Sequence, residues 1–380
     1  MERSGASVID VTLRIKPHTG RTRHLLNVDE VIALFGGFTR LRSLHVTGGI
    51  VDIVCMLLDT HVIATHILFL HLHIADQWEP VELPNNLFGG QAPIREMCFE
   101  SFSYIIAPQW LLRGITHFTS NQQIPLRNLL DTLRQMPTLL SFTLEGCVED
   151  WLGAEDIQIP MQNLMYLKVD VDSGSPIIFD ALHRRLALPN GTKKKLHCHG
   201  GSDSYASKRW SFYIMAIPPS LRDVINAAGG LQHVQFSGGI QVGSFYLWIG
   251  DAGYEEAEFL FELSWEFKES GEDLSRPIFE LPAMCERLGV ERIRTFRIPV
   301  VSLDQYGFKQ LWKLLKMPSD VEELELCADA ARGLCSAQLE GEGHLWAALP
   351  GLRSVRMVKG HVAEMTEKEL LGVLRGDAKH

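Results

Sequence analysis

The residues that could do chemistry in this sequence fall into three short groups. The first, His197-Cys198-His199, carries imidazole and thiol groups, which are good zinc ligands. Alternation along a strand would place His197 and His199 on one face and Cys198 on the other, so the three side chains cannot converge on one ion. We therefore interpret this group as a partly buried cysteine between two exposed histidines.

The second group is Asp170-Val171-Asp172, which follows the apolar run that begins at Leu164. Two aspartates at a strand end can hold magnesium and supply a nucleophile. Ser173-Gly174 does not complete a phosphatase motif, and no partner motif is evident. We expect a solvated loop that follows the strand.

The third group is the basic run Lys193-Lys194-Lys195, which could act in nuclear import or nucleic-acid binding. The whole chain, however, has 36 basic and 46 acidic residues and a net charge of −10. Three lysines give only a small positive field on such a chain. A solvated surface loop is the better interpretation, and we expect no nucleic-acid partner.

Other common signatures of catalysis and of compartment are missing from the sequence. It holds no Gly-x-Ser-x-Gly, no His-Glu-x-x-His and no phosphate-loop Gly-Lys-Ser/Thr, so it predicts no enzyme, no metal site and no cofactor. Its seven cysteines, without a Cys-x-x-Cys, indicate reduced thiols in the cytoplasm or nucleus. No apolar run reaches the roughly 18 residues of a membrane helix, and we see no signal peptide, so we expect no membrane partner.

A short apolar pattern recurs along the whole chain. One apolar residue is followed three positions later by a second, and two positions after that by a third. The clear copies have their middle residue at Leu44, Leu70, Met97, Phe142, Leu167, Val234, Leu263, Phe296, Leu324 and Val355. Weaker copies are centred at Val11, Phe118 and Leu196. Successive middle residues lie 21 to 38 positions apart, and those from Leu44 to Leu167 stay within the leucine-rich-repeat period of about 20–29.

Each copy predicts a strand whose last two apolar residues point inward, because residues two apart share a strand face. Helical stretches lie between copies, as at Pro125–Met136, at Phe308–Leu315 after a capping box, and at Leu370–Leu374. The sequence thus predicts an α/β leucine-rich-repeat solenoid, a horseshoe with a parallel β-sheet on the concave face and irregular helices on the convex face. Chance matches in a leucine-rich chain are the alternative. The asparagine or cysteine common after such strands occurs once, as Cys147.

We expect a single irregular repeat domain over residues 1–380. Loop insertions are expected near residues 189–209, 237–256 and 271–277, which are rich in glycine, serine or charge. Within the second of these, Phe245, Leu247 and Ile249 alternate as in an extra strand.

The repeat alignment predicts which side chains line the concave face. Two columns arise, one from the residue between the last two apolar positions and one from the residue before the middle position. From them we select ten candidate partner-binding residues: His45, Phe69, His71, His117, Tyr166, Lys168, His233, Arg297, Glu325 and Arg356. Aromatic and arginine side chains often dominate interfaces. His45 and His71 would be adjacent, so we predict weaker partner binding below about pH 6, when both can be charged.

Several segments resemble fungal F-box and leucine-rich-repeat proteins of mushroom-forming species. They are Glu2–Gly5 leading into Val8–Leu13, then Phe38–Leu44, Met136–Phe142 and Val321–Leu326. The resemblance implies the substrate-recruiting part of an SCF-type ubiquitin ligase. In that family an N-terminal F-box binds the adaptor and hence the cullin, and the repeats capture the substrate. No F-box sequence precedes the repeats in this chain, so adaptor and cullin are implied partners only where an F-box lies upstream.

Taken together, the patterns predict a non-enzymatic scaffold that recognises a protein or peptide on a concave face, as the substrate-binding part of a ligase receptor. A stand-alone repeat scaffold without a ligase link is the alternative. An enzyme ranks third, because no nucleophile, base and stabilising group come together in the sequence.

Overall fold

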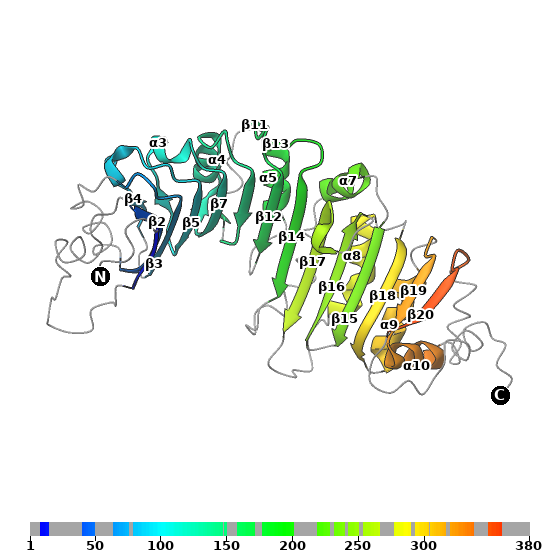
Figure 1. The fold of residues 1–380 in the computed structure, drawn as a ribbon. Helices are drawn as coiled ribbons and strands as arrows, with labels where there is room; N and C mark the ends of the chain where they lie inside the picture. Colours follow the sequence, from blue (N-terminus) through cyan, green and yellow to red (C-terminus); the bar gives the residue numbers. More distant parts are fainter. Residues whose placement is uncertain are drawn as a thin grey trace. The chain divides into compact units, whose positions relative to one another are not determined.

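The structure is a computed structural model, shown in Figure 1. It describes residues 8–14, 40–49, 64–75, 79–146, 148–149, 158–171, 177–200, 219–228, 232–239, 242–250, 254–266, 277–289, 293–303, 305–316, 320–337 and 349–358. The chain divides into two compact units. Unit 1 comprises Met1–Asp170 and Ala181–Thr192, and unit 2 comprises Val171–Asp180 and Lys193–His380.

Unit 1 is built on a parallel sheet. Its strands, in the order in which they pair, are β1 (Ile9–Arg14), β2 (Leu41–Gly49), β3 (Phe69–Ala75), β5 (Glu96–Ser101), β7 (His117–Gln122), β9 (Ser141–Leu144) and β12 (Tyr166–Val171). Order in the sheet follows order in the chain, as Figure 1 shows. Parallel neighbours need a crossover connection, and the repeat period leaves enough residues for one.

The middle residues of the apolar pattern lie directly opposite one another in this sheet. Leu44 pairs with Leu70, Leu70 with Met97, and the series continues through Phe118, Phe142 and Leu167. All of these side chains are buried. The predicted strands and their register in this part of the chain are therefore confirmed, including the weak copies at Val11 and Phe118.

Short elements connect the long strands of unit 1. Three two-residue parallel ladders join β4 (Val81–Glu82) to β6 (Ile105–Ile106), β8 (Ile124–Pro125) to β10 (Val148–Glu149), and β11 (Ile159–Pro160) to β13 (Leu186–Ala187). The helical segments are η2 (Leu87–Gly90), α3 (Gln109–Leu112), α4 (Leu126–Arg134) and α5 (Ile177–Arg185), the last shared between the units. Helix α4 confirms the helix predicted after Pro125, and its leucines at 126, 129, 130 and 133 are buried.

Side chains that precede the strands of unit 1 bond to the backbone of the previous repeat. Thr138 donates to the carbonyl oxygens of Arg113 and Ile115, at 3.1 and 2.8 Å. Asn163 donates to Pro137 O at 2.9 Å. Thr138, Asn163 and Thr192 each lie four residues before a middle position. This series therefore makes hydrogen bonds between repeats at the start of the strands. The repeat asparagine that is absent from this chain would have made such bonds after the end of the strands.

Unit 2 also contains a sheet, but its strands do not follow chain order. They pair as β14 (Lys193–Gly200), β17 (Phe259–Glu266), β16 (Val242–Ile249), β15 (Gln232–Gly239), β18 (Ile293–Ser302), β19 (Glu323–Leu326) and β20 (Ser354–Met357). Strand β16 is antiparallel to both β15 and β17, and the other pairs are parallel. The prediction of an all-parallel sheet is therefore wrong for this unit.

The physical reason lies in the connections. Only residues 240 and 241 separate β15 from β16, and a link this short permits a hairpin but no parallel crossover. The extra strand suspected at Phe245–Ile249 is confirmed as part of β16. As a result β17, not β15, lies beside β14.

The insertion of β16 also changes the register expected for β17. Leu196 pairs with Phe261, which lies two residues before Leu263, the middle residue of the copy in β17. The shift is two residues, so each side chain keeps its face of the sheet.

The loop insertion predicted near 189–209 is wrong for Lys193, Lys194 and Lys195, because these residues begin strand β14. Residues 201–209 of that insertion lie outside the described part of the chain.

Helices of unit 2 connect the parallel strands. They are α7 (Pro219–Ala228), α8 (Pro277–Leu288), α9 (Gln305–Lys316) and α10 (Ala328–Ala337), with the short η5 (Tyr254–Glu256) before β17. Neighbours in this series contact each other, and α10 also contacts β18 and β19. The predicted helix at 308–315 is confirmed as α9, whereas the helix predicted at 370–374 and the insertion at 271–276 lie outside the described residues.

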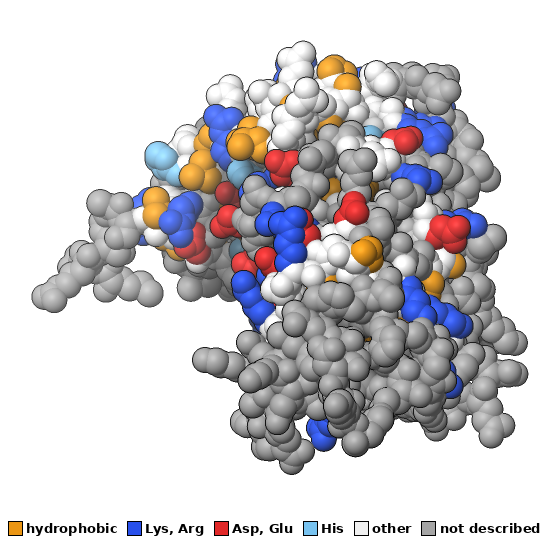
Figure 2. Space-filling view, turned by 90° about the vertical axis from the view of Figure 1, so that its right-hand side faces the viewer, with side chains coloured by type: hydrophobic (Ala, Val, Ile, Leu, Met, Phe, Trp, Pro, Cys, Tyr) orange, Lys and Arg blue, Asp and Glu red, His pale blue; other side chains and the backbone are white. Residues whose placement is uncertain are grey.

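The helices and the surface charges can be compared with what the sequence predicts. No helix in the described part of the chain is long and apolar enough to cross a bilayer. On the side seen in Figure 2, described acidic and basic side chains lie close to one another. This mixture is consistent with the near balance of 36 basic and 46 acidic residues.

Candidate functional site

The outward face of the unit 1 sheet carries three columns of side chains in register. The first runs through residues between buried positions: Thr12, His45, His71, Cys98, Thr119, Thr143 and Lys168. The second comprises Asp10, Ser43, Phe69, Glu96, His117, Ser141 and Tyr166. The third comprises Arg14, Thr47, His73, Glu100 and Asn121. Adjacent strands in a sheet lie about 4.8 Å apart, so neighbours within a column touch.

The predicted candidates of unit 1 occupy the first two columns as the repeat alignment placed them. His45, His71 and Lys168 lie in the first, and Phe69, His117 and Tyr166 lie in the second. His117 is exposed, and the other five are half-buried. Their role in partner binding stays a prediction.

His45, Phe69 and His71 form a compact group. The centroid of the His45 ring lies 4.8 Å from that of Phe69 and 5.1 Å from that of His71. Nδ1 of His45 lies 3.1 Å from Nδ1 of His71, so one of the two nitrogens donates a hydrogen bond and the other accepts it. Burial, and then the nearby His71, lower the pKa of His45, although Asp10 acts in the opposite direction. His45 therefore gains a proton at a lower pH than an exposed histidine does.

Lys168 lies between two carboxylates at the far end of the first column. Its Nζ is 3.4 Å from Glu145 Oε1 and 3.2 Å from Asp170 Oδ2. Burial alone would lower the pKa of Lys168, but Asp170 and Glu145 outweigh it and hold the pKa above its ordinary value. Lys168 is therefore a fixed positive charge with two intramolecular partners.

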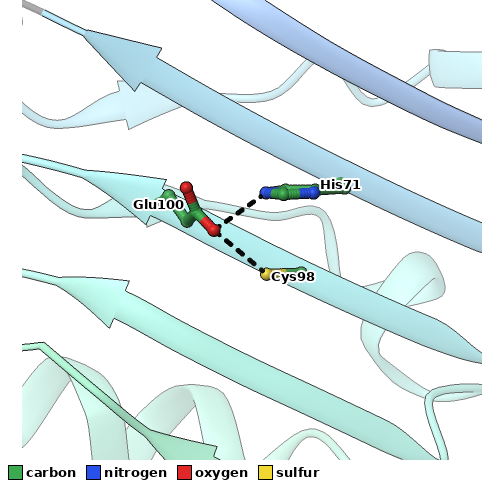
Figure 3. Close-up of side chains that lie close together, drawn as sticks. All are labelled: His71, Cys98 and Glu100. Carbon is green, nitrogen blue, oxygen red and sulfur yellow. Dashed lines mark hydrogen bonds and ion pairs between the residues drawn. The ribbon is translucent and has the colours of Figure 1, made fainter. Parts of the chain in front are cut away.

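A second group joins the first and third columns across strands β3 and β5. His71 Nε2 lies 3.1 Å from Glu100 Oε1, and Cys98 Sγ lies 4.0 Å from the same oxygen. Glu100 Oε2 accepts a hydrogen bond from His73 Nδ1 at 2.6 Å. Figure 3 shows the Glu100 carboxylate between the imidazole of His71 and the thiol of Cys98.

Without a metal ion, the thiol of this group is not activated as a nucleophile. Burial, followed by Glu100 and Glu145, raises the pKa of Cys98 to about 12. A thiol with this pKa is protonated at neutral pH and is a poor nucleophile. An imidazole, a thiol and a carboxylate whose donor atoms all lie within 4.8 Å of one another are, however, a set that can hold a metal ion.

In unit 2 the predicted candidates also lie on one sheet face. Arg297, Glu325 and Arg356 share a column with His197, Glu262, Tyr246 and Gln235. His233 lies in the neighbouring column, beside Trp248. Arg297 Nε lies 3.0 Å from Glu325 Oε2, so these two charges pair with each other. Glu262, predicted for the second column, lies in the first because of the β17 register.

An aromatic cluster occupies the centre of this face. Trp248 is 1% exposed and packs with Ala257, Leu260 and Tyr246. The His233 ring stacks on Trp248, with 5.1 Å between the centroids. The Arg297 guanidinium lies 5.5 Å from the centroid of the Trp248 ring. His233 and Arg297 therefore contribute to packing on this face as well as to its charge.

Two kinds of residue on these faces were missed by sequence reasoning. Glu100 and His73 lie in a third column, which the same alignment would have found if extended by two residues. Trp248 and Tyr246 lie on the strand that interrupts the repeat, so no repeat position marked them. Near β14 the alternation was predicted correctly, because Cys198 is buried while the His197 and His199 rings lie 4.0 Å apart on the other face. His199 is exposed as expected, whereas His197 is half-buried.

No protein-family model matches this chain, and a search of curated proteins finds no match. Among solved structures, the chain is similar to the leucine-rich-repeat-containing protein LegL7 of Legionella pneumophila. The identity is 11%, the alignment covers 97% of this chain and 99% of that chain, and the TM-score is 0.25. At this TM-score the likeness carries no argument about the fold, which rests on the strand pairing described above.

Proposed function

We propose that this protein is a non-enzymatic recognition scaffold of the leucine-rich-repeat type, and that the outward sheet face of unit 1 binds a segment of another protein. The observation that carries the proposal is the unbroken register of outward side chains across seven parallel strands. Straight columns of mixed polar and aromatic side chains form a continuous surface on which an extended or helical partner segment can lie.

The composition of the face also favours a protein partner. Phe69 and Tyr166 are aromatic, and the exposed His117 lies in the same column, two strands away from each of them. Aromatic side chains contribute large contact areas at interfaces with little loss of conformational entropy. The high pKa of Cys98 is a further reason to propose binding and not catalysis on this face.

The test compares which proteins are captured by wild-type protein and by two variants. The face variant combines Phe69→Ala, Tyr166→Ala and His117→Ala. The control variant changes exposed residues away from the columns, Arg113→Ala and Arg127→Ala, the second of them on α4. We expect a partner that the control retains and the face variant loses, and that binds the purified wild-type protein directly. Identical partners for all three proteins would contradict the proposal.

The narrower role, recruitment of substrates to an SCF-type ubiquitin ligase, rests on the resemblance to the fungal family. It predicts that the F-box adaptor and a cullin copurify with the protein as expressed from its own gene. Failure to copurify them, with a face-dependent partner still bound, would favour the stand-alone scaffold.

A further inference from the structure

The side chains of His71, Cys98 and Glu100 meet on the outward face of unit 1 because of the sheet register. His71 on β3 pairs with Cys98 on β5, and His73 pairs with Glu100. Cys98 and Glu100 are two residues apart, so both point outward from the same strand. Figure 3 shows the three groups directed toward one another.

Their spacing suits a single zinc ion. Zinc binds histidine nitrogen, cysteine sulfur and carboxylate oxygen at about 2.0–2.3 Å, so ligand atoms in a tetrahedron lie about 3.3–3.7 Å apart. Here His71 Nε2 and Glu100 Oε1 are 3.1 Å apart, Cys98 Sγ and Glu100 Oε1 are 4.0 Å apart, and all three lie within 4.8 Å of one another. Small side-chain rotations bring these atoms to the required distances.

The protein by itself leaves one of these atoms poorly satisfied. Nε2 of His71 is buried, and it makes no well-directed hydrogen bond within the described residues, although Glu100 lies at ion-pair distance. A buried polar atom without such a bond is rare in folded proteins, and an unseen ion is one common explanation. Glu100 and Glu145 also place negative charge near Cys98.

We propose that unit 1 binds a zinc ion through His71 Nε2, Cys98 Sγ and Glu100 Oε1. The side chains of His71 and Glu100 are 24% and 31% exposed, so the site lies near the surface of unit 1. The site goes beyond the proposed recognition function, since a protein partner could bind the face with or without the metal.

Two further histidines position the ligands. Nδ1 of His45 lies 3.1 Å from Nδ1 of His71, and when it accepts the proton of that nitrogen it leaves Nε2 of His71 with its lone pair for the metal. His73 Nδ1 binds Glu100 Oε2 at 2.6 Å, which leaves Oε1 directed at the ion. Such outer contacts typically change metal affinity by about 10–100-fold.

The experiment uses full-length protein stripped of metal and titrated with Co²⁺, which takes zinc sites and reports thiolate ligation through a charge-transfer absorption band. Zinc affinity is then measured by competition with a chromophoric chelator. We expect one equivalent of Co²⁺ to produce the band in the wild-type protein, and Cys98→Ser to abolish it. Cys327→Ser is the matched control, because Cys327 is also a half-buried free thiol.

Variants of the other residues separate ligands from positioning residues. His71→Gln and Glu100→Gln should each lower zinc affinity by about 10-fold or more. His45→Phe should keep the charge-transfer band and lower affinity by about 10–100-fold. His117→Gln, on the same face, should change neither. Circular dichroism of each metal-free variant establishes that it is folded.

Three results would overturn the proposal. The first is the absence of a thiolate band in the folded wild-type protein at stoichiometric Co²⁺. The second is a band of wild-type intensity in Cys98→Ser. The third is unchanged zinc affinity in both His71→Gln and Glu100→Gln. Loss of the protein partner in the face variant, which leaves His71, Cys98 and Glu100 intact, tests the recognition function separately.

Discussion

Glu262 illustrates how the surroundings of one residue decide its charge. It lies half-buried on β17, and His197 Nε2 is 3.2 Å from its Oε1. Burial raises the pKa of Glu262, but hydrogen bonds from His197 and Tyr246 and the nearby histidine charges outweigh burial, so the pKa lies below its usual 4.5. A lowered carboxyl pKa stabilises the folded state above the unfolded pKa, and this stability is lost as the pH falls through the folded pKa.

We therefore predict that unit 2 loses stability in acid partly through Glu262. Between pH 6.5 and a pH well below the usual 4.5, the wild-type free energy of unfolding should fall further than that of Glu262→Gln, because the amide cannot titrate. Urea unfolding at several pH values measures the difference. Glu255→Gln, at an exposed position on η5, is the control. Parallel pH profiles for wild type and Glu262→Gln would contradict the prediction.

At the scale of elements, unit 1 is held together between repeats by backbone ladders and by the series Thr138, Asn163 and Thr192. Thr192 is 3% exposed, and its hydroxyl lies 2.8 Å from Leu164 O and 2.9 Å from Pro189 O. A buried carbonyl that loses its donor carries a desolvation cost. The series thus supplies part of the lateral stability that an asparagine ladder gives to more regular repeats.

We predict that Thr192→Val destabilises unit 1. The change keeps the side-chain shape but removes the donor, so we expect a loss of about 1–3 kcal/mol in the free energy of unfolding. Thr192→Ser keeps the hydroxyl and should lose clearly less. Urea unfolding of the two variants provides the comparison, and equal losses would show that the hydrogen bond is unimportant.

Helices α9 and α10 of unit 2 approach closely because of a glycine. A Cβ on Gly333 would lie 2.3 Å from Cε1 of Phe308, so the aromatic ring could not keep its place. Overpacking of this kind costs about 1–3 kcal/mol. Alanine would gain about 0.8–1.0 kcal/mol in helix propensity, which offsets only part of that cost.

We accordingly predict that Gly333→Ala lowers the thermal stability of unit 2, with a net loss of about 1 kcal/mol. Ser336→Ala, at an exposed position of the same helix, should be neutral or slightly stabilising. The double variant Gly333→Ala with Phe308→Leu should recover part of the loss. Calorimetry of the three variants measures this, and a stabilised Gly333→Ala would refute the close contact.

At the scale of the whole molecule, the net charge argues against nucleic acid as a partner. The net charge is −10, and the three lysines of the basic run belong to strand β14 instead of an exposed loop. Lys194 is half-buried, and burial lowers its pKa although Glu258 opposes the effect. Nonspecific affinity for nucleic acid comes from neutralised phosphates, and this run offers few free cations for that purpose.

We predict no saturable binding of single-stranded RNA or DNA below about 0.1 mM at roughly physiological salt. Fluorescence anisotropy with labelled oligonucleotides measures it. The variant Lys193→Ala with Lys195→Ala should behave like the wild type. Binding that the double variant abolishes would instead restore the basic run as a nucleic-acid site.

Much of the fold and part of the candidate site could be predicted from the sequence. The strands centred from Val11 to Val355 follow from a local apolar pattern, because burial of one strand face demands it at every copy. In unit 1 consecutive copies are neighbours in the sheet, so alignment of the apolar pattern also gives the register, and the pairing of His45 with His71 was predictable. In unit 2 the predicted register failed at Leu263, since β16 changes which strands are neighbours.

The sequence by itself thus determined which residues are buried in each strand, since that depends on neighbours two positions away in the chain. Tertiary structure alone decided the side-chain contacts: the approach of Glu100 to His71 and Cys98, and the stacking of His233 on Trp248. The ligands of the first come from strands 27 residues apart, and Trp248 lies on a strand that reverses direction. The repeat alignment gives the column of each side chain in unit 1, but only the folded sheet fixes the side-chain conformations that bring Glu100 Oε1 to 3.1 Å from His71 Nε2.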